Sequence, residues 1–433
     1  MSLPDLPGEL LDEIAEFFYD PNSTDPSTSS SEPNDIYRAL VSTCKALRAH
    51  FQPRVFSVVH LAMPMRVCHL ADLIEDNPLL ASYIRVIRLD VDLKCEGMFE
   101  FPPLLAILRA VDTFSPPVEI HLHFSTARVE SLNTNTSHPC THIGDAPTSF
   151  LRFVTRIYDH LLSDIFFPIA VLERCSNLRE LDARNMLFVV SKASGIVPEG
   201  DRVSHLLRPK LDVLDVSHCD PTVLRILSEE IFDLSVVKRV SVTNIDMGTE
   251  TDPDSKVAMT RRLLDTCARS VEVLHIDADF ASSSALGTFY DLSLLPNLRE
   301  CHFLIRTVAS ANPVLQLSNL LRTLPPLPEH NLQHLQLTFR FKDRFSALPD
   351  TDDSAQSHLI LYLDAWSKFD DALVWILASG TRPFKVTLLF SARPAAGFDR
   401  SLLNTLFINW KKRYLPRSSG KRNLEIVFKQ FIW

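Results

Sequence analysis

The sequence predicts an α/β fold in which short strands alternate with helices, behind a small group of N-terminal helices. Three features predict it. Short segments of alternating apolar and polar residues recur along the chain, with stretches of helical periodicity between them. From residue 178 onward these segments begin 33, 26, 34, 27 and 34 residues apart. The first 56 residues carry helical patterns instead.

The predicted strands share a period of two, which buries one face of each strand. In the body of the chain they cover residues 84–89, 118–122, 178–183, 211–216, 237–242, 271–276, 298–303 and 332–337, and in the tail 383–390 and 423–428. An Asn-Leu pair opens several of them, at Asn177, Asn297 and Asn331. A residue pair that recurs at one position indicates true repetition of a structural unit.

The predicted helices fill the intervals between the strands. They cover residues 102–111, 150–162, 166–174, 221–231, 257–270 and 315–324, with amphipathic helices at 357–378 and 401–412 in the tail. Each unit is therefore one strand plus one helix. Such a unit cannot cover its own apolar face, so neighbouring units must stack and bury it for each other.

The Leu-x-x-Leu-x-Leu spacing and the period of about 26–34 residues resemble long leucine-rich repeats. We therefore expect residues 57–433 to form an irregular leucine-rich-repeat-like solenoid, capped by two degenerate units. Polar insertions are expected at residues 125–148, 245–256 and 341–357.

The N-terminal module is predicted to contain three short helices, at residues 3–18, 36–49 and 51–56. The first has an apolar stripe that includes Leu10, Leu11 and Ile14, and Pro7 suits its first turn. Residues 20–35 are rich in Ser and Pro and are interpreted as a disordered loop. A module this small has a marginal core. Its apolar surface either caps the larger domain or serves a partner.

Three sequence segments resemble an F-box. They are Leu6-Pro7-x-Glu9-Leu10-Leu11-x-x-Ile14, the stretch from Ala39 to Arg48, and Gln52 to Phe56, which is similar to the tail of fungal F-box proteins. The resemblance implies a substrate receptor of an SCF-type cullin–RING ubiquitin ligase. Residues 1–56 would dock on a Skp-type adaptor, and through it on a cullin. The implied adaptor-binding residues are Leu6, Pro7, Leu10, Leu11, Ile14, Leu40, Val41, Cys44 and Leu47.

In this interpretation the repeat strands bind an unidentified protein substrate, and no residue is catalytic. The receptor would contribute proximity between substrate and conjugating enzyme. The predicted exposed strand positions are Arg179, Asp212, Lys238, Glu272, Arg299 and Gln333. The alternative is an interaction scaffold that directs no degradation.

Composition argues against nucleic acid or a membrane as the main partner. The formal net charge is −9, and the first fifty residues hold nine acidic residues against three basic ones. Both kinds of partner require clustered Lys and Arg. The eight Cys form no Cys-x-x-Cys pair, and neither a signal peptide nor a membrane-spanning segment is evident. We expect a soluble protein of the cytoplasm or nucleus with reduced thiols, some of them buried beside strands (Cys175, Cys267 and Cys301).

Motifs of enzymes and cofactor sites are weak. The chain has 10 Gly and contains no P-loop, dinucleotide-binding or nucleophile-elbow motif. His138-x-Cys140-x-His142 offers metal donors, but a zinc site needs four, and a surface loop is the better explanation of these residues. The acidic pairs Asp90-x-Asp92, Asp277-x-Asp279 and Asp352-Asp353 could bind a divalent cation, and the geometry allows it for the first two, but a solvated rim of strand-end acids is the favoured interpretation. We expect no cofactor and no metal. A cryptic enzyme would require such groups to converge in one pocket.

Overall fold

The structure is a computed structural model of the whole chain, and it forms two compact units, Met1–Asn177 and Leu178–Trp433. It describes residues 7–8, 10–11, 39–61, 64–91, 101–113, 118–124, 138–139, 148–159, 165–183, 186–189, 208–216, 221–246, 256–279, 291–307, 313–324, 331–341, 363–378, 384–392, 412–418, 421 and 424–430. The predicted loop at 20–35, most of the three predicted insertions and nearly all of the predicted helix 401–412 lie outside these residues.

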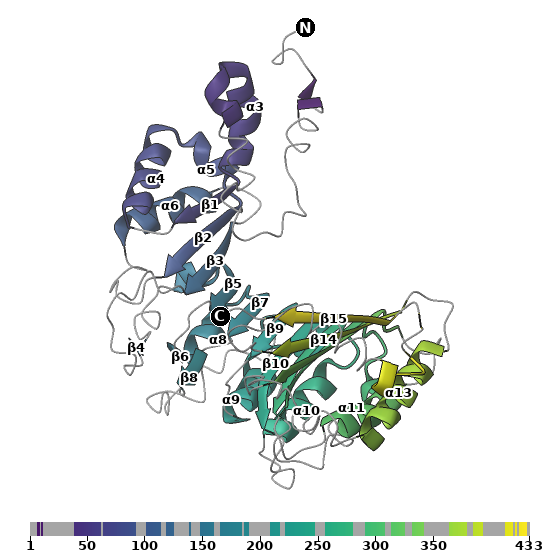
Figure 1. Cartoon of the computed structure of the whole chain (residues 1–433). Coiled ribbons are helices and arrows are strands. Elements are labelled where there is room, and N and C mark those ends of the chain that lie inside the picture. The colour runs from purple at the N-terminus through teal and green to yellow at the C-terminus, as the bar shows by residue number, and fades with distance from the viewer. Residues whose placement is uncertain are drawn as a thin grey trace. The chain divides into compact units, whose positions relative to one another are not determined.

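The first unit alternates strands and helices (Figure 1). Its elements are α3 (Lys45–Val55), β1 (Val58–Leu61), α4 (Pro64–Asp76), α5 (Leu79–Tyr83), β2 (Val86–Val91), α6 (Pro102–Asp112), β3 (Glu119–Phe124), β4 (His138–Pro139), α7 (Thr148–Leu151), β5 (Val154–Asp159), β6 (Ile165–Pro168) and α8 (Ile169–Arg174). Strands β1, β2, β3 and β5 pair in that order, and all of them are parallel.

The apolar face of this sheet supplies the core of the first unit. Leu61, Leu89, Leu122 and Ile157 occupy one register row and are at most 1% exposed. Helices α4 and α6 bury Val67, Leu70, Ile107 and Val111. Because side chains alternate along a strand, the neighbouring rows project to the opposite face of the sheet.

Residues 154–159 form strand β5, so the predicted helix at 150–162 is wrong; only α7 is helical there. Val154 and Ile157 are spaced as on a helix, which suggested that assignment. In the structure both are buried because a register shift at Thr155 inserts an extra residue between them. Strand β1 and helix α4 were also absent from the prediction.

The helical segments near residue 44 are divided differently from the prediction. Residues 39–43 are helical, Cys44 is extended, and α3 then continues through the predicted third piece to Val55. Ser42 Oγ and Thr43 Oγ1 donate to the carbonyls of Ala39 and Leu40 at 2.7 Å. Such side-chain bonds compete with the backbone ladder of a helix, which is consistent with a break at Cys44.

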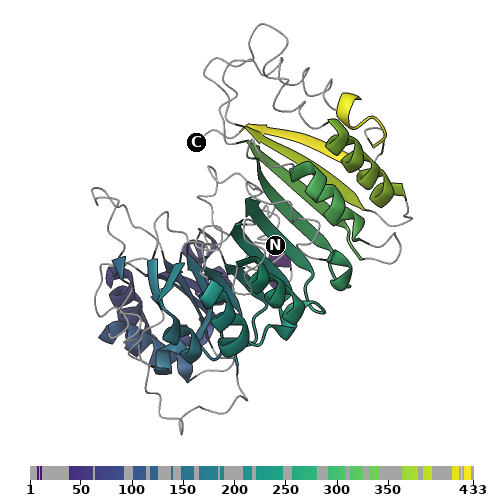
Figure 2. The same cartoon turned by 90° about the horizontal axis from the view of Figure 1, so that it is seen from below.

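The second unit repeats the strand–helix pattern with a longer sheet (Figure 2). Its elements are β7 (Glu180–Ala183), β8 (Met186–Val189), β9 (Val213–Val216), α9 (Pro221–Ile226) with the π turn η5 (Leu227–Ile231), η6 (Leu234–Val236), β10 (Arg239–Asp246), α10 (Lys256–Cys267), β11 (Val273–Asp279), η8 (Leu292–Leu294), β12 (Glu300–Thr307), α11 (Pro313–Arg322), β13 (His334–Phe341), α13 (Leu363–Ala378), β14 (Lys385–Ala392) and β15 (Leu424–Gln430). Strands β7, β9, β10, β11, β12, β13, β14 and β15 are parallel neighbours in chain order.

The core of the second unit is again formed by rows of apolar residues. One row is at most 7% exposed: Leu181, Leu214, Val240, Leu274, Cys301, Leu335, Val386 and Leu424. The helices that follow the strands cover this face (Figure 2). The predicted strands of both units, apart from the ends of each element, are confirmed, as are the predicted helices at 102–111, 257–270 and 315–324.

A short Asp-Leu-Ser motif, which the sequence patterns above do not include, shapes the entry to two strands. Asp233 and Asp291 accept hydrogen bonds from the backbone N–H of Ser235 and Ser293 at 3.0 and 2.9 Å. Each caps a single turn, η6 or η8, in the segment that leads into β10 or β12. The Ser235 hydrogen bonds lower the pKa of Asp233.

The predicted burial of three cysteines is confirmed. Cys175, Cys267 and Cys301 are at most 1% exposed. Burial raises the pKa of Cys175 and of Cys267 to about 12, and raises that of Cys301 as well. These thiols therefore act as small core hydrophobes. Among the described helices, none combines the length and apolar character needed to cross a membrane.

Candidate interaction surfaces

The N-terminal segment forms a hydrophobic cluster with α3, separate from the strand–helix core. Leu11, Leu47 and Phe51 are its buried centre, at 6%, 2% and 1% exposure. Three partly buried residues pack around it: Leu40, Val41 and Cys44. We call these six residues the N-terminal cluster. The helical turn that carries Leu11 starts at Pro7, whose carbonyl accepts the N–H of both Leu10 and Leu11 at 3.1 Å.

The predicted adaptor-binding residues occupy different positions in this cluster. Leu10 is 43% exposed and Pro7 is exposed. Leu11 and Leu47 face the chain's own core, so their contribution to a docking surface would be support rather than contact. Leu6 and Ile14 lie outside the described residues. A Cβ at Gly8 would lie 3.1 Å from His50 Cε1, so the turn approaches α3 closely.

The six predicted substrate-binding residues lie together along one edge of the second unit's sheet. They are Arg179, Asp212, Lys238, Glu272, Arg299 and Gln333, each one residue before its strand begins. A backbone ladder joins them, because the N–H of each donates to the carbonyl of the one before it at 2.7–2.9 Å.

Charges alternate along this edge, which limits its use for recognition. Arg299 and Glu272 form an ion pair at 3.5 Å. Neighbouring charges of opposite sign compensate each other. The row therefore has little net charge with which to attract a charged partner. A slip of one residue along a strand moves a side chain to the other face. Arg179, Lys238, Arg299 and Gln333 are exposed, and Asp212 and Glu272 are half-buried, so their role in substrate binding stays a prediction.

One face of the second unit's sheet lies opposite the helices (Figure 2), and we call it the open face. It carries a polar row that the sequence motifs did not reveal. In register order the row is Asp182, Asp215, Ser241, His275, His302, Gln336, Thr387 and Glu425. His275 and His302 stack with ring centroids 4.3 Å apart, and His334 meets His302 edge-on at 5.5 Å. The alternation of polar residues between buried leucines was the signal that could have located this row.

The surroundings of His302 favour its neutral form. The pKa of His302 is lowered, first by burial and then by the nearby His334, while Glu300 opposes the shift. His334 Nε2 lies 3.0 Å from Thr387 Oγ1. Lys385 and Glu425 pair at 2.6 Å beside them, and this contact lowers the pKa of Glu425.

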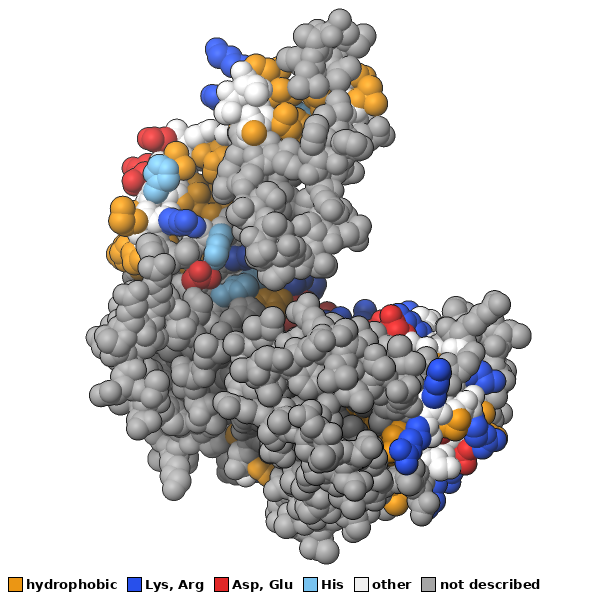
Figure 3. All heavy atoms as spheres, viewed as in Figure 1, with side chains coloured by type: hydrophobic (Ala, Val, Ile, Leu, Met, Phe, Trp, Pro, Cys, Tyr) orange, Lys and Arg blue, Asp and Glu red, His pale blue; other side chains and the backbone are white. Residues whose placement is uncertain are grey.

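The open face of the first unit has a second polar row, formed by His60, Arg88, His121 and Arg156 in register. Figure 3 shows histidine side chains beside basic and acidic ones over these strands. His60 Nε2 lies 2.9 Å from Asp90 Oδ1, and Arg156 Nη1 donates to the hydroxyl of Tyr158 at 3.2 Å. The pKa of His121 is lowered by burial and by Arg156, although Glu119 opposes the shift.

No metal centre is formed by the described side chains, since no group of three or more His, Cys, Asp or Glu converges among them. Asp90, which belongs to one of the acidic pairs considered above for a divalent cation, contacts His60. Only the backbone of His138 is described, in β4, and Cys140 and His142 lie outside the described residues. The polar surfaces described above are histidine-rich faces of the two sheets.

Comparison with known proteins shows little likeness. No protein-family model matches the chain, and no curated protein matches it. A crystal structure of the mouse RP105/MD-1 complex is similar over 80% of this chain and 51% of that chain, at 14% sequence identity and a TM-score of 0.28. The match thus spans about half of the mouse chain. The strand–helix units themselves form a mixed α/β fold with parallel sheets, consistent with a leucine-rich-repeat-like solenoid.

Proposed function

We propose that this chain is a substrate receptor of an SCF-type ubiquitin ligase, in which the N-terminal cluster docks on a Skp-type adaptor and the repeat sheets bind a protein substrate. The proposal rests on the F-box resemblance of residues 6–14, 39–48 and 52–56. One observation supports it. The N-terminal segment forms its own small core and leaves Leu10 43% exposed.

Leu10 is an exposed leucine beside a very small hydrophobic core. Burying a leucine side chain fully is worth about 1.5–3 kcal/mol. A six-residue cluster holds too little apolar surface to be stable by itself. Covering Leu10 and Pro7 with an adaptor would therefore stabilise both the module and the complex. The repeat sheets, with polar rows on their open faces, suit a protein partner.

Adaptor docking is tested by Leu10→Glu in the full chain, with purified Skp-type adaptor in a pull-down. The matched control is Leu294→Glu, which changes another leucine, 53% exposed, in the second unit. We expect Leu10→Glu to abolish capture and Leu294→Glu to retain it, with unchanged thermal unfolding for both. Full adaptor capture by Leu10→Glu would rule out this docking surface.

A scaffold without a role in degradation is the alternative, since the fold by itself supports only protein binding. Binding partners identified with the wild-type chain distinguish the two. Their half-lives should lengthen in cells that express only Leu10→Glu if the chain is a ligase receptor. Unchanged half-lives, together with intact partner binding, would favour the scaffold.

A further inference from the structure

The open face of the first unit places two guanidinium groups on either side of a buried imidazole. Arg88 on β2, His121 on β3 and Arg156 on β5 are register partners. Neighbouring strands lie about 4.8 Å apart, so the two arginine Cα atoms are separated by about 10 Å. Both side chains are long enough to reach a group that lies over His121.

The Nε2 atom of His121 can still form a hydrogen bond. The residue is only 6% exposed, and its Nε2 makes no hydrogen bond with any described residue. The nearest carboxylate oxygen, Glu119 Oε2, lies 3.5 Å away, at the limit of a hydrogen bond. A buried polar atom left in this state costs free energy unless a ligand completes it.

The carboxylates of Asp90 and Glu119 both contact other side chains. Asp90 is engaged by His60 at 2.9 Å, and Glu119 Oε2 accepts a hydrogen bond from Thr155 at 3.4 Å. Arg88 is exposed and has no ion-pair partner among the described residues. Arg156 donates to the neutral hydroxyl of Tyr158, a bond that a dianion could replace.

We propose that Arg88, His121 and Arg156 bind the phosphomonoester group of a phosphorylated segment of a protein partner. A phosphate presents three oxygens, enough for both guanidinium groups and the imidazole N–H. A carboxylate has two oxygens, which one guanidinium already occupies in a bidentate pair. On binding, Arg156 leaves Tyr158, and His121 donates through Nε2. The proposal rests on the proposed function only in taking the partner to be a protein.

The test follows the imidazole of His121 by NMR in the full chain labelled at histidine Cε1, with His121→Gln to assign its resonance. The probe is the tripeptide Gly-phosphoserine-Gly, compared with Gly-Glu-Gly, Gly-Ser-Gly and inorganic phosphate. We expect a saturable shift of the His121 resonance with the phosphorylated peptide, and a rise in the pKa of His121. Charge-assisted hydrogen bonds of this kind predict a loss of affinity of about tenfold or more in Arg88→Gln.

Arg109→Gln is the matched control, because Arg109 is an exposed arginine on helix α6, which packs against the apolar face of the sheet. It should bind the phosphorylated peptide like the wild type. An unmoved His121 resonance, or equal losses in Arg88→Gln and Arg109→Gln, would overturn the site. Equal binding of Gly-Glu-Gly would overturn the preference for phosphate, and equal binding of inorganic phosphate would overturn the peptide as its source. Adaptor capture by Arg88→Gln should stay at the wild-type level, so failure here is separate from failure of adaptor docking.

Discussion

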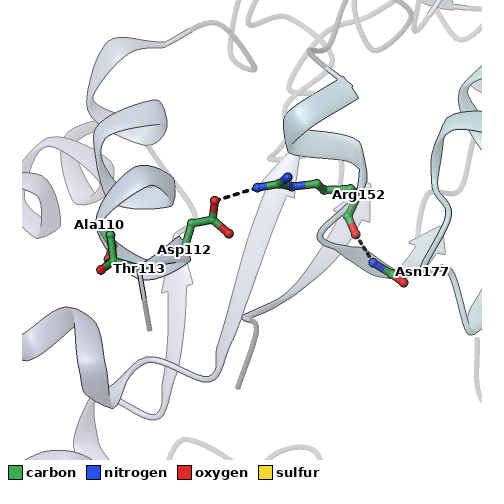
Figure 4. A network of polar contacts seen from close by, with 5 residues as sticks. All are labelled: Ala110, Asp112, Thr113, Arg152 and Asn177. Carbon is green, nitrogen blue, oxygen red and sulfur yellow. Dashed lines mark hydrogen bonds and ion pairs between the residues drawn. The ribbon is translucent and has the colours of Figure 1, made fainter. Parts of the chain in front are cut away.

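The side-chain amide of Asn297 donates a hydrogen bond to the backbone carbonyl of Arg269 at 2.6 Å, and so ties one repeat to the one before it. Asn331 does the same to the carbonyl of Pro296 at 2.8 Å. Arg269 and Pro296 are equivalent, since each lies four positions before its strand, β11 or β12. In the first unit, Asn177 reaches the carbonyl of Arg152 at 2.6 Å, and Arg152 also pairs with Asp112 (Figure 4). The Asn-Leu repeat therefore has a physical role.

Loss of the hydrogen bond from Asn297 to the carbonyl of Arg269 should weaken the stacking of repeats. Asn297→Asp keeps the shape of the side chain but removes the N–H donor to Arg269. Because Asn297 is exposed, we expect a loss of about 0.5–1.5 kcal/mol in the free energy of unfolding. Urea denaturation measures it. Ser293→Asn, on a neighbouring exposed position, is expected to change stability by less; an effect as large as that of Asn297→Asp would contradict the role of the tie.

A buried carboxylate near the C-terminal end of the second unit should matter more than its exposed neighbour. Asp370 is 1% exposed and accepts the backbone N–H groups of Arg417 and Ser418 at 2.9 and 3.0 Å. Asp370→Ala leaves two N–H groups without their acceptor, at a cost of about 2–4 kcal/mol. Asp371, which pairs with Arg417 at the surface, is the control, and Asp371→Ala should cost less than about 1 kcal/mol. Equal losses in chemical denaturation would refute the assignment.

His302 should make the stability of the second unit depend on pH. The pKa of His302 is lowered in the folded state, so the unfolded chain binds the proton more readily. Its contribution to stability is present above pH about 6.5, the ordinary histidine pKa, and is lost as pH falls through the lowered value. His302→Gln should therefore flatten the decline in unfolding free energy between pH 7 and 5. An unchanged slope would show that His302 does not carry the effect.

The buried cysteines should be inert in the native protein. At pH 8, a thiol-specific reagent should modify Cys44 and Cys68, which are half-buried, well before Cys175 and Cys267, whose pKa values are raised to about 12. The reactive form of a cysteine is the thiolate, and the raised pKa suppresses it. Peptide mapping by mass spectrometry follows each site. Unfolding in urea should equalise the rates; equal rates in the native protein would contradict the core placement.

The N-terminal cluster should depend on its buried centre. Phe51→Ala removes the most buried side chain of the cluster and should cost about 3–5 kcal/mol locally. We expect limited proteolysis to cut near residues 39–56 much faster while the second unit stays resistant. His50→Ala, at a half-buried position on the same helix, should have a smaller effect. Unchanged cleavage in Phe51→Ala would mean that the cluster does not hold this segment together.

Much of the strand–helix order could be read from local pattern, and the exceptions have a physical cause. Alternation of period two located β7, β9, β10, β11, β12, β13, β14 and β15 to within a few residues. Strand β5 was mistaken for a helix because the extra residue at Thr155 disguises its alternation. The break at Cys44 was missed because the residues on both sides are apolar at helical spacing.

The candidate sites were harder to locate because they depend on pairing between strands. The predicted edge residues differ from the open-face residues by one position, a difference set by where each strand begins. Nothing in the local sequence around Arg88 points to His121 or Arg156, which are 33 and 68 residues further along the chain. Only the parallel register of β2, β3 and β5 brings them into one row.

By itself, the sequence determined that this chain alternates strands and helices, repeats an Asn-Leu pair, and buries three cysteines. Those properties follow from short-range periodicity and from the hydrophobic effect on single residues. The tertiary structure alone decided which polar residues share a sheet face, that Leu11 turns inward while Leu10 stays exposed, and that histidines from separate repeats stack. These are contacts between distant segments, and they exist only after strands pair and helices pack.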